Sequence, residues 1–174
     1  MLKDLLKASR SYRSFDPTCH ISEELLTDWI DHTRYAPSSI NLQMLKFRTV
    51  TAKEECDKLL SLTRWAGKLK DMTLPPVGRA PVAYVVICTD DNVITDSQRF
   101  QKDVGIAAQT LMLAAAESGF GGCMIGSFSP EQLTSALSLP SGVIPSLVLG
   151  LGKPDETVCI TYPCFPPPRC RLGG

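Results

Sequence analysis

Several features that would assign this 174-residue chain to common functional classes are missing. Eighteen Lys and Arg balance eighteen Asp and Glu, so the chain lacks the excess positive charge that nucleic-acid and membrane-surface binding usually need. No apolar run reaches the roughly 18 residues of a membrane span, and the first residues lack the continuous apolar core of a secretory signal. We therefore expect a soluble, cytoplasmic protein that binds neither nucleic acid nor membrane.

Histidine is scarce and cysteine is scattered, which removes two large groups of catalytic and metal sites. The two histidines, His20 and His32, form no convincing nucleophilic arrangement with Ser and Asp or with Cys. The seven cysteines include no C-x-x-C pair and no His at ligand spacing, so we expect no metal site. Cys88 and Cys123 lie in apolar runs, where cysteine behaves as a small hydrophobic residue, and buried thiols fit a reducing compartment.

Length and composition favour one folded domain over residues 1–174. The apolar fraction of 44% is ordinary for a globular chain, and no repeat or linker divides the sequence. The tail, residues 159–174, is unusually rich in proline and cysteine. Because the formal net charge is zero, repulsion between copies is weak and a homodimer is favoured.

Hydrophobic periodicity predicts an α+β fold. The β-branched run 81–89 is apolar throughout, which is typical of a central strand buried on both faces. Residues 103–118 are apolar almost all round, which predicts a buried helix that ends at Gly119. Further strands are expected at 47–50, 121–125 and 144–151, and further helices are expected to begin at the capping residues Ser22, Thr51 and Ser129.

Two polar segments flank the helix that begins at Ser22. The first, residues 9–15 (the Arg box), contains Arg10 and Arg13, whose planar guanidinium groups match a phosphate bidentately, and Ser11 adds a donor. Taken alone, this segment also fits a solvated basic patch. The second, residues 36–43 (the Ser-Asn box), is also polar, and two such segments around one helix suggest a bound ligand that carries phosphate.

In the order of these motifs, the chain resembles the FMN-dependent nitroreductase family from about Ser9 to Lys153. The segments that carry the resemblance are Arg10-Ser11-Tyr12-Arg13, Pro37-Ser38-Ser39-Ile40-Asn41-Leu42-Gln43, residues 103–119 and Ile125-Gly126-Ser127-Phe128. The resemblance implies a nitroreductase-like fold, with a central, mainly antiparallel sheet flanked by helices, in a dimer.

The resemblance also implies a set of FMN-binding residues. Arg10 and Ser11 would hold the phosphate, and Arg13 would lie toward the ribityl chain and the pyrimidine edge. The backbone N–H of Gly126 would face flavin N5, which makes Gly126 and Arg13 the catalytic positions, with Ser127 assisting. The Ser-Asn box would reach the flavin of the other subunit, so that a homodimer shares two sites. The box residues implied in this contact are Pro37, Ser38, Ser39, Asn41 and Gln43.

The activity that the resemblance implies is FMN-dependent NAD(P)H oxidation by a ping-pong mechanism. NADH or NADPH would pass hydride to flavin N5, and a nitroaromatic or quinone-like acceptor would then collect the electrons. A flavin carrier with little turnover, or a specialised relative such as a reductive dehalogenase or a flavin-cleaving enzyme, remains an alternative. Trp65 fits either a flavin-side position or an ordinary core anchor.

The C-terminal sequence departs from the family pattern. Family members usually end in a segment that carries a basic pair, which completes the phosphate site and wraps the partner subunit. Here the tail contains Pro166-Pro167-Pro168, which favours an extended conformation, and Arg169 and Arg171 are candidates for the pair. A short tail would leave the dimer less interlocked and the flavin more exposed.

Overall fold

The structure is a computed structural model that describes residues 1–67, 72–90 and 97–160. Its elements, in chain order, are α1 (Leu2–Ala8), β1 (Phe15–Asp16), α2 (Glu23–Asp31), the 3₁₀ turns η1 (His32–Tyr35) and η2 (Ser39–Asn41), β2 (Lys46–Val50), α3 (Lys53–Leu62), β3 (Ala83–Asp90), α4 (Ser97–Glu117), β4 (Gly121–Ile125), α5 (Pro130–Ala136) and β5 (Val143–Pro154). No helix in this described part is long and apolar enough to cross a membrane.

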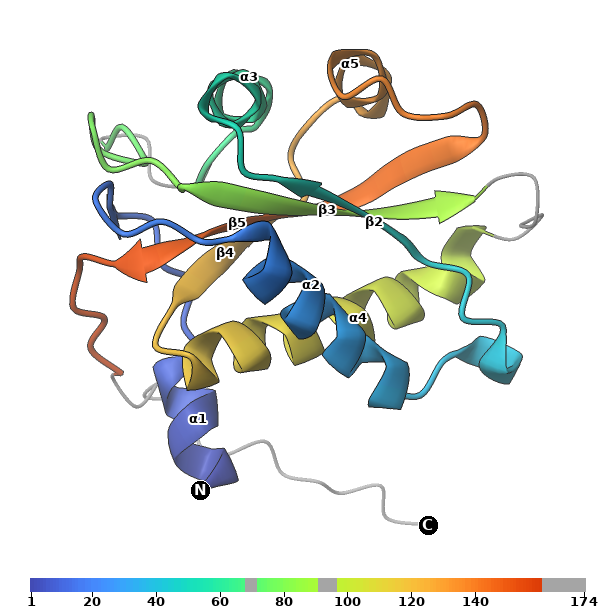
Figure 1. Cartoon of the computed structure of the whole chain (residues 1–174), viewed down its shortest axis with the longest axis horizontal. Helices are drawn as coiled ribbons and strands as arrows, with labels where there is room; N and C mark the ends of the chain where they lie inside the picture. Colours follow the sequence, from blue (N-terminus) through green and yellow to red (C-terminus); the bar gives the residue numbers. More distant parts are fainter. Residues whose placement is uncertain (68–71, 91–96, 161–174) are drawn as a thin grey trace, which may run out of the picture.

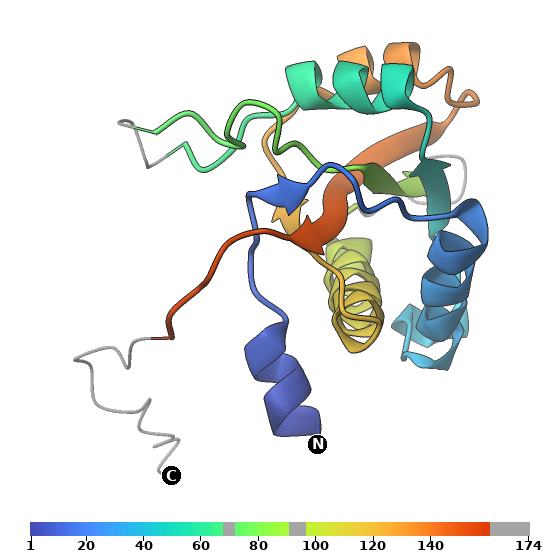
Figure 2. The ribbon, with the colours of Figure 1, turned by 60° about the vertical axis from the view of Figure 1, so that its left-hand side comes forward.

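The strands form one five-stranded sheet in which every pairing is antiparallel. β3 lies between β2 and β5, and the long β5 also pairs with β4 and, through its last residues, with β1. Figures 1 and 2 show α3 and α5 on one face of the sheet and α2 and α4 on the other. The predicted fold class, an antiparallel sheet flanked by helices, is confirmed.

The core is divided between the two faces of the sheet because successive side chains of a strand point to opposite faces. Ala83, Val85 and Ile87 of β3 pack with α2 and α4 in one cluster. Tyr84, Val86 and Cys88 pack with α3 and α5 in the other. β3 is buried on both faces, as its continuous apolar run predicts.

Most helix ends follow the expected capping residues. Ser22 Oγ accepts the Leu25 N–H at the start of α2, and Ser129 Oγ accepts the Gln132 N–H at the start of α5. Gly119, at φ +78°, ends α4 in the left-handed conformation that glycine adopts without strain. The prediction that Thr51 caps α3 is wrong, since Ala52 is the N-cap and makes no side-chain hydrogen bond.

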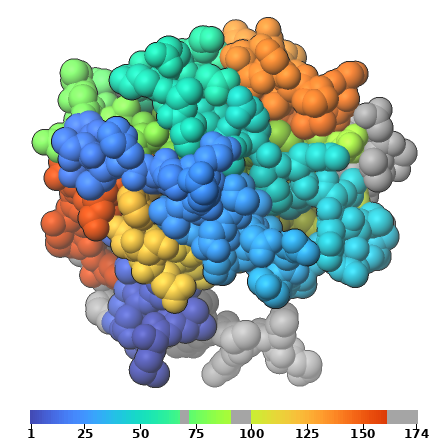
Figure 3. Space-filling view, viewed as in Figure 1, coloured from blue at the N-terminus to red at the C-terminus, as the bar shows by residue number. Residues whose placement is uncertain are grey.

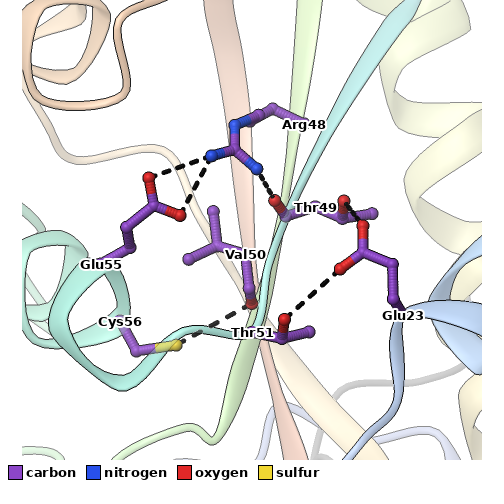
Figure 4. Close-up of polar contacts among 7 residues, drawn as sticks. All are labelled: Glu23, Arg48, Thr49, Val50, Thr51, Glu55 and Cys56. Carbon is purple, nitrogen blue, oxygen red and sulfur yellow. Dashed lines mark hydrogen bonds and ion pairs between the residues drawn. The ribbon is translucent and has the colours of Figure 1, made fainter.

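The Thr51 hydroxyl has a partner distant in the sequence instead. Thr51 Oγ1 donates to Glu23 Oε2 at 3.3 Å, and Thr49 Oγ1 donates to the other oxygen of the same carboxylate. Figure 4 shows the Glu23 side chain reaching both hydroxyls, while Arg48 Nη2 donates to both carboxylate oxygens of Glu55 at 3.0 Å. Glu23 is the first residue of α2, so these bonds fix the start of α2 against β2.

Buried acidic groups predict a loss of stability at alkaline pH. Burial raises the pKa of Cys56 to about 11 and that of Cys88 to about 12, and it also raises the pKa of Tyr84. The unfolded thiols lose their protons near the ordinary value of 9.0, whereas the folded ones keep them to a higher pH. The free energy of unfolding is therefore expected to fall as the pH rises above about 9.

Denaturant unfolding at a series of pH values tests this expectation. A Cys88→Ala variant, which keeps Cys56 and Tyr84, should show a shallower decline than the parent chain. A free energy of unfolding that stays constant between about pH 8 and pH 11 would contradict the assignment of these groups as protonated and buried.

Candidate functional site

The Arg box lies against the first residues of β4. The Tyr12 N–H donates to the Gly122 carbonyl at 2.9 Å, and Ser11 forms an isolated parallel bridge with Gly122. A Cβ at Gly121 would lie 2.6 Å from the Tyr12 ring, which is closer than real Cβ contacts. Gly121 therefore lets the Arg box approach the strand, a role that the sequence did not indicate.

The Arg10 guanidinium lies at the C-terminal end of α1. Its Nε donates to the Ser9 carbonyl at 2.8 Å, and its Nη2 donates to the Leu6 carbonyl at 2.7 Å. These bonds fix the side chain and use two of its five N–H groups. The other N–H groups of Arg10 have no hydrogen-bond partner among the described residues and are available to an anion.

Arg13 lies between Glu156 and β4. The backbone N–H groups of Arg13 and Ser14 both donate to Glu156 Oε1, and Arg13 Nη1 donates to the Ser11 carbonyl at 3.2 Å. Burial raises the pKa of the Cys123 thiol, and the nearby Arg13 guanidinium opposes that shift. Arg13 Nε is buried and has no hydrogen-bond partner within the described part of the chain, so this donor is available to a ligand.

Gly126 follows the last residue of β4 and is exposed, as is Ser127. A Cβ at Gly126 would meet no atom within 4 Å, so the fold itself does not require glycine there. The Ser127 carbonyl accepts the Arg64 N–H at 2.9 Å, which anchors the backbone next to this open space. Trp65 is half-buried, donates to Thr63 Oγ1 at 3.1 Å and packs against the α3 and α5 side of the core.

The Ser-Asn box has an unusual backbone. Ile40, Asn41 and Gln43 have φ values of 48°, 57° and 49°, a conformation that a β-branched residue such as Ile rarely adopts. Ser39 precedes them, and its N–H and its hydroxyl both donate to the Asp103 carboxylate of α4, each at 2.9 Å. Gln43 Nε2 donates to Asn41 Oδ1 at 3.2 Å, within the box itself.

A cavity of about 280 Å³ opens beside the Ser-Asn box, between α2, η1 and α4. Pro37, Ser38 and Gln43 line it on the side of the box, and Asp103 lines it from α4. Ser38 Oγ is buried without a hydrogen-bond partner among the described residues. Each of the two boxes therefore contains a buried polar atom that has no hydrogen-bond partner among the described residues.

The two boxes lie far apart within one chain. α1, which precedes the Arg box, lies against Ala116 near the end of α4, whereas the Ser-Asn box is bound to Asp103 nearer its start. Thirteen residues of helix at 1.5 Å each separate these positions by about 20 Å. Figure 3 shows the end of β5 (orange-red), which follows the contact with the Arg box, to the left, and the light-blue to cyan region that includes the Ser-Asn box to the right.

The residues present fit a ligand with a phosphate and a flat ring. The Arg10 N–H groups and the Arg13 Nε that have no partner in the described part of the chain, together with the Ser11 hydroxyl, offer donors for an anion. The open space at Gly126 leaves its backbone accessible to a planar group. The donor set and the open backbone thus suit a flavin mononucleotide.

Comparison with known sequences identifies the family. The profile described as the nitroreductase family matches residues 6–153, and the chain belongs to this family. An FMN reductase [NAD(P)H] of Bacillus subtilis is 31% identical, with 84% of this chain and 63% of that protein covered. The "Putative NADH dehydrogenase/NAD(P)H nitroreductase" of Methanothermobacter thermautotrophicus is 28% identical, with 97% of this chain and 85% of that protein covered.

Solved structures share the fold. A nitroreductase family protein from Streptococcus pneumoniae superimposes with a TM-score of 0.75 at 18% identity, over 93% of this chain and 94% of the other. An FMN-dependent nitroreductase from Clostridium difficile gives 0.73 at 23% identity, over 91% of each chain. The predicted family is confirmed, and the predictions of an enzyme, of FMN and of NAD(P)H match the names of these relatives.

Sequence patterns alone do not identify two residues of the site region, Asp103 and Glu156. Asp103 has a signal, since it is the one charged residue in the stretch 103–116, which is otherwise apolar or uncharged. Glu156 follows β5 and has no comparable signal. His32, by contrast, makes a local contact at the end of α2, where its Nδ1 lies 2.7 Å from the Asp28 carbonyl oxygen. Arg169 and Arg171 lie outside the described residues.

Proposed function

We propose that the protein is an FMN-dependent NAD(P)H oxidoreductase that reduces small nitroaromatic or quinone-like acceptors. The observation that carries the proposal is the arrangement along β4, with the Arg box at its first residues and Gly126 just past its end. Four residue steps separate Gly122 from Gly126, or about 13 Å at 3.3 Å per residue. An anion site and an open backbone at this separation suit a ligand with phosphate at one end and a ring at the other.

Each site residue has a defined role in this proposal. Arg10 and Ser11 bind the phosphate, and Arg13 places a cation against the part of the ring that gains negative charge on reduction. Gly126 presents its backbone N–H to the reactive edge, and Ser127 assists. When bound, FMN supplies two-electron chemistry, taking a hydride from NAD(P)H and passing electrons to the acceptor in the second half of a ping-pong cycle.

The protein acts as a homodimer in which each FMN site is shared. The separation of about 20 Å along α4 between the regions of the two boxes supports a site to which each chain contributes one box. A second copy supplies the missing box, and the exposed side chains of Ile40 and Leu42 offer apolar surface for that contact. The five cysteines that the structure describes are free thiols, which supports a cytoplasmic location.

An Arg10→Ala variant tests the cofactor assignment. The variant is expected to bind FMN more weakly by about 1.5–3 kcal/mol, the range for a hydrogen bond to a charged group, with the fold retained. Fluorescence titration of the apoprotein with FMN measures the change. Arg48→Ala is the matched control, because Arg48 pairs with Glu55 away from both boxes, and its FMN affinity should equal that of the parent chain. Equal affinities for all three proteins would remove Arg10 from the site.

A flavin carrier with little turnover is the second candidate, since the ring would lie next to the exposed Gly126 and Ser127. Steady oxidation of NADH or NADPH with an added quinone separates the two. Turnover with the acceptor supports the oxidoreductase, and a single stoichiometric reduction without turnover supports the carrier.

A further inference from the structure

Asp103 is a buried carboxylate whose position the proposed chemistry leaves unexplained. It is 5% exposed and lies in α4, directly before the apolar part of that helix. Burying a carboxylate is unfavourable unless hydrogen bonds compensate for the lost water. Both of its oxygens accept hydrogen bonds from one residue, Ser39, through the backbone N–H and the hydroxyl.

These two bonds hold the Ser-Asn box at the point where its backbone becomes strained. Ile40, Asn41 and Gln43 all adopt positive φ, which is unfavourable for non-glycine residues and persists only where the surroundings enforce it. Such strain gathers at functional sites. Within the described residues, the Ser39 bonds to Asp103 are the side-chain hydrogen bonds that tie this box to a long helix.

We propose that Asp103 is a positioning residue that fixes the Ser-Asn box and thereby controls occupancy of the FMN site of the other subunit. This inference rests on the proposed shared site, and it adds a residue that does not itself touch the flavin. α4 is 21 residues long and packs against the sheet, so it provides a rigid support for the box. Without Asp103, the Ser39 donors lose their acceptor and the box is free to relax from its strained conformation.

Two substitutions separate the hydrogen bonds of Asp103 from its negative charge. Asp103→Ala removes both acceptors and is expected to weaken FMN binding by about tenfold or more. Asp103→Asn keeps the shape, since its carbonyl accepts the Ser39 N–H and its amide donates to Ser39 Oγ. The affinity of this variant is expected to lie within about threefold of the parent chain. Parent-like FMN binding by Asp103→Ala would overturn the inference.

Mixed dimers test whether Asp103 acts on the other subunit. A chain with Arg10→Ala, which damages its own phosphate site, is co-expressed with a chain carrying Asp103→Ala, and doubly tagged dimers are purified. In the mixed dimer, one FMN site then combines the damaged Arg box with the damaged Ser-Asn box, and the other site combines two intact boxes. We expect one high-affinity FMN per mixed dimer, measured by visible absorbance, whereas neither homodimer binds FMN with parent affinity. A subunit that is merely misfolded cannot produce this recovery.

A parallel mixture of Arg10→Ala with Ser39→Trp distinguishes failure of the inference from failure of the proposed function. Ser39→Trp damages the Ser-Asn box directly. If this pair recovers one site and the Asp103→Ala pair does not, the shared site stands and the role of Asp103 is refuted. If neither pair recovers a site, the shared site fails and the inference fails with it.

Discussion

A Gly126→Val variant is expected to lose most of its affinity for FMN while folding like the parent chain. Nothing lies within 4 Å of a Cβ at this position, so the apoprotein accommodates the side chain. In the proposed complex, the same space would lie between the strand backbone and the flavin ring, two rigid surfaces. Overpacking costs about 1–3 kcal/mol and the upper end applies to rigid neighbours, so FMN affinity should fall about 100-fold.

Three measurements define the outcome for Gly126. FMN titration gives the affinity, and denaturant unfolding of the apoprotein gives the stability, which is expected to change by less than about 0.5 kcal/mol. Gly126→Ala, which adds a single methyl group, should show a smaller loss of affinity. Unchanged FMN binding by the valine variant would place the ring elsewhere and reject Gly126 as the position next to it.

A Gly122→Ala variant should show the opposite pattern, a large loss of stability. A Cβ at Gly122 would overlap the Gly150 carbonyl oxygen of β5 and lie 2.8 Å from Leu151 Cδ2. The carbonyl belongs to the strand paired with β4 and cannot move without breaking the register Cys123 to Gly150. We expect the free energy of unfolding to fall by about 3 kcal/mol or more.

Gly105→Ala is the matched control for this change. Gly105 lies in α4, where an added Cβ meets no atom within 4 Å, and alanine in a helix is more stable than glycine by about 0.5–1 kcal/mol. Denaturant unfolding should therefore separate the two variants by about 4 kcal/mol, with opposite signs relative to the parent chain. Similar stabilities for the two variants would contradict the close approach of β4 and β5 at Gly122.

The elements that sequence predicts well are those fixed by local chemistry. β3 follows from a run of β-branched residues, and the end of α4 follows from Gly119 after an apolar helix. Strand β4 matches its expected bounds of 121–125. The start of α4 at Ser97 was missed, because its first turns are polar and have no apolar periodicity that would indicate a helix.

The errors arise where a side chain bonds to a distant part of the chain. Thr51 was assigned as a cap because the local sequence fits a capping box, but its hydroxyl binds Glu23, which precedes it by 28 residues. Asp103 and Ser39 are 64 residues apart, and no local pattern indicates that the fold brings them together. Such contacts depend on the packing of α2, α4 and the sheet.

In the candidate site too, local sequence predicts some features, whereas others depend on contacts between distant residues. The residue types predict the Arg box and the Ser-Asn box, and the family resemblance implies their roles. The structure adds the distance between the two boxes and the position of Arg10 against the carbonyls of Leu6 and Ser9. Glu156, which accepts two backbone hydrogen bonds from the Arg box, could not be identified from a motif. The FMN-contacting roles of the box residues stay predictions.

A visible absorption spectrum of the purified protein with added FMN, recorded before and after anaerobic NADH or NADPH, tests the central claim most directly. We predict that the protein retains a flavin band after removal of free FMN and that the band bleaches when the reduced nicotinamide is added. A protein that retains no flavin, or a retained band that neither NADH nor NADPH bleaches, would contradict the assignment as an FMN-dependent NAD(P)H oxidoreductase.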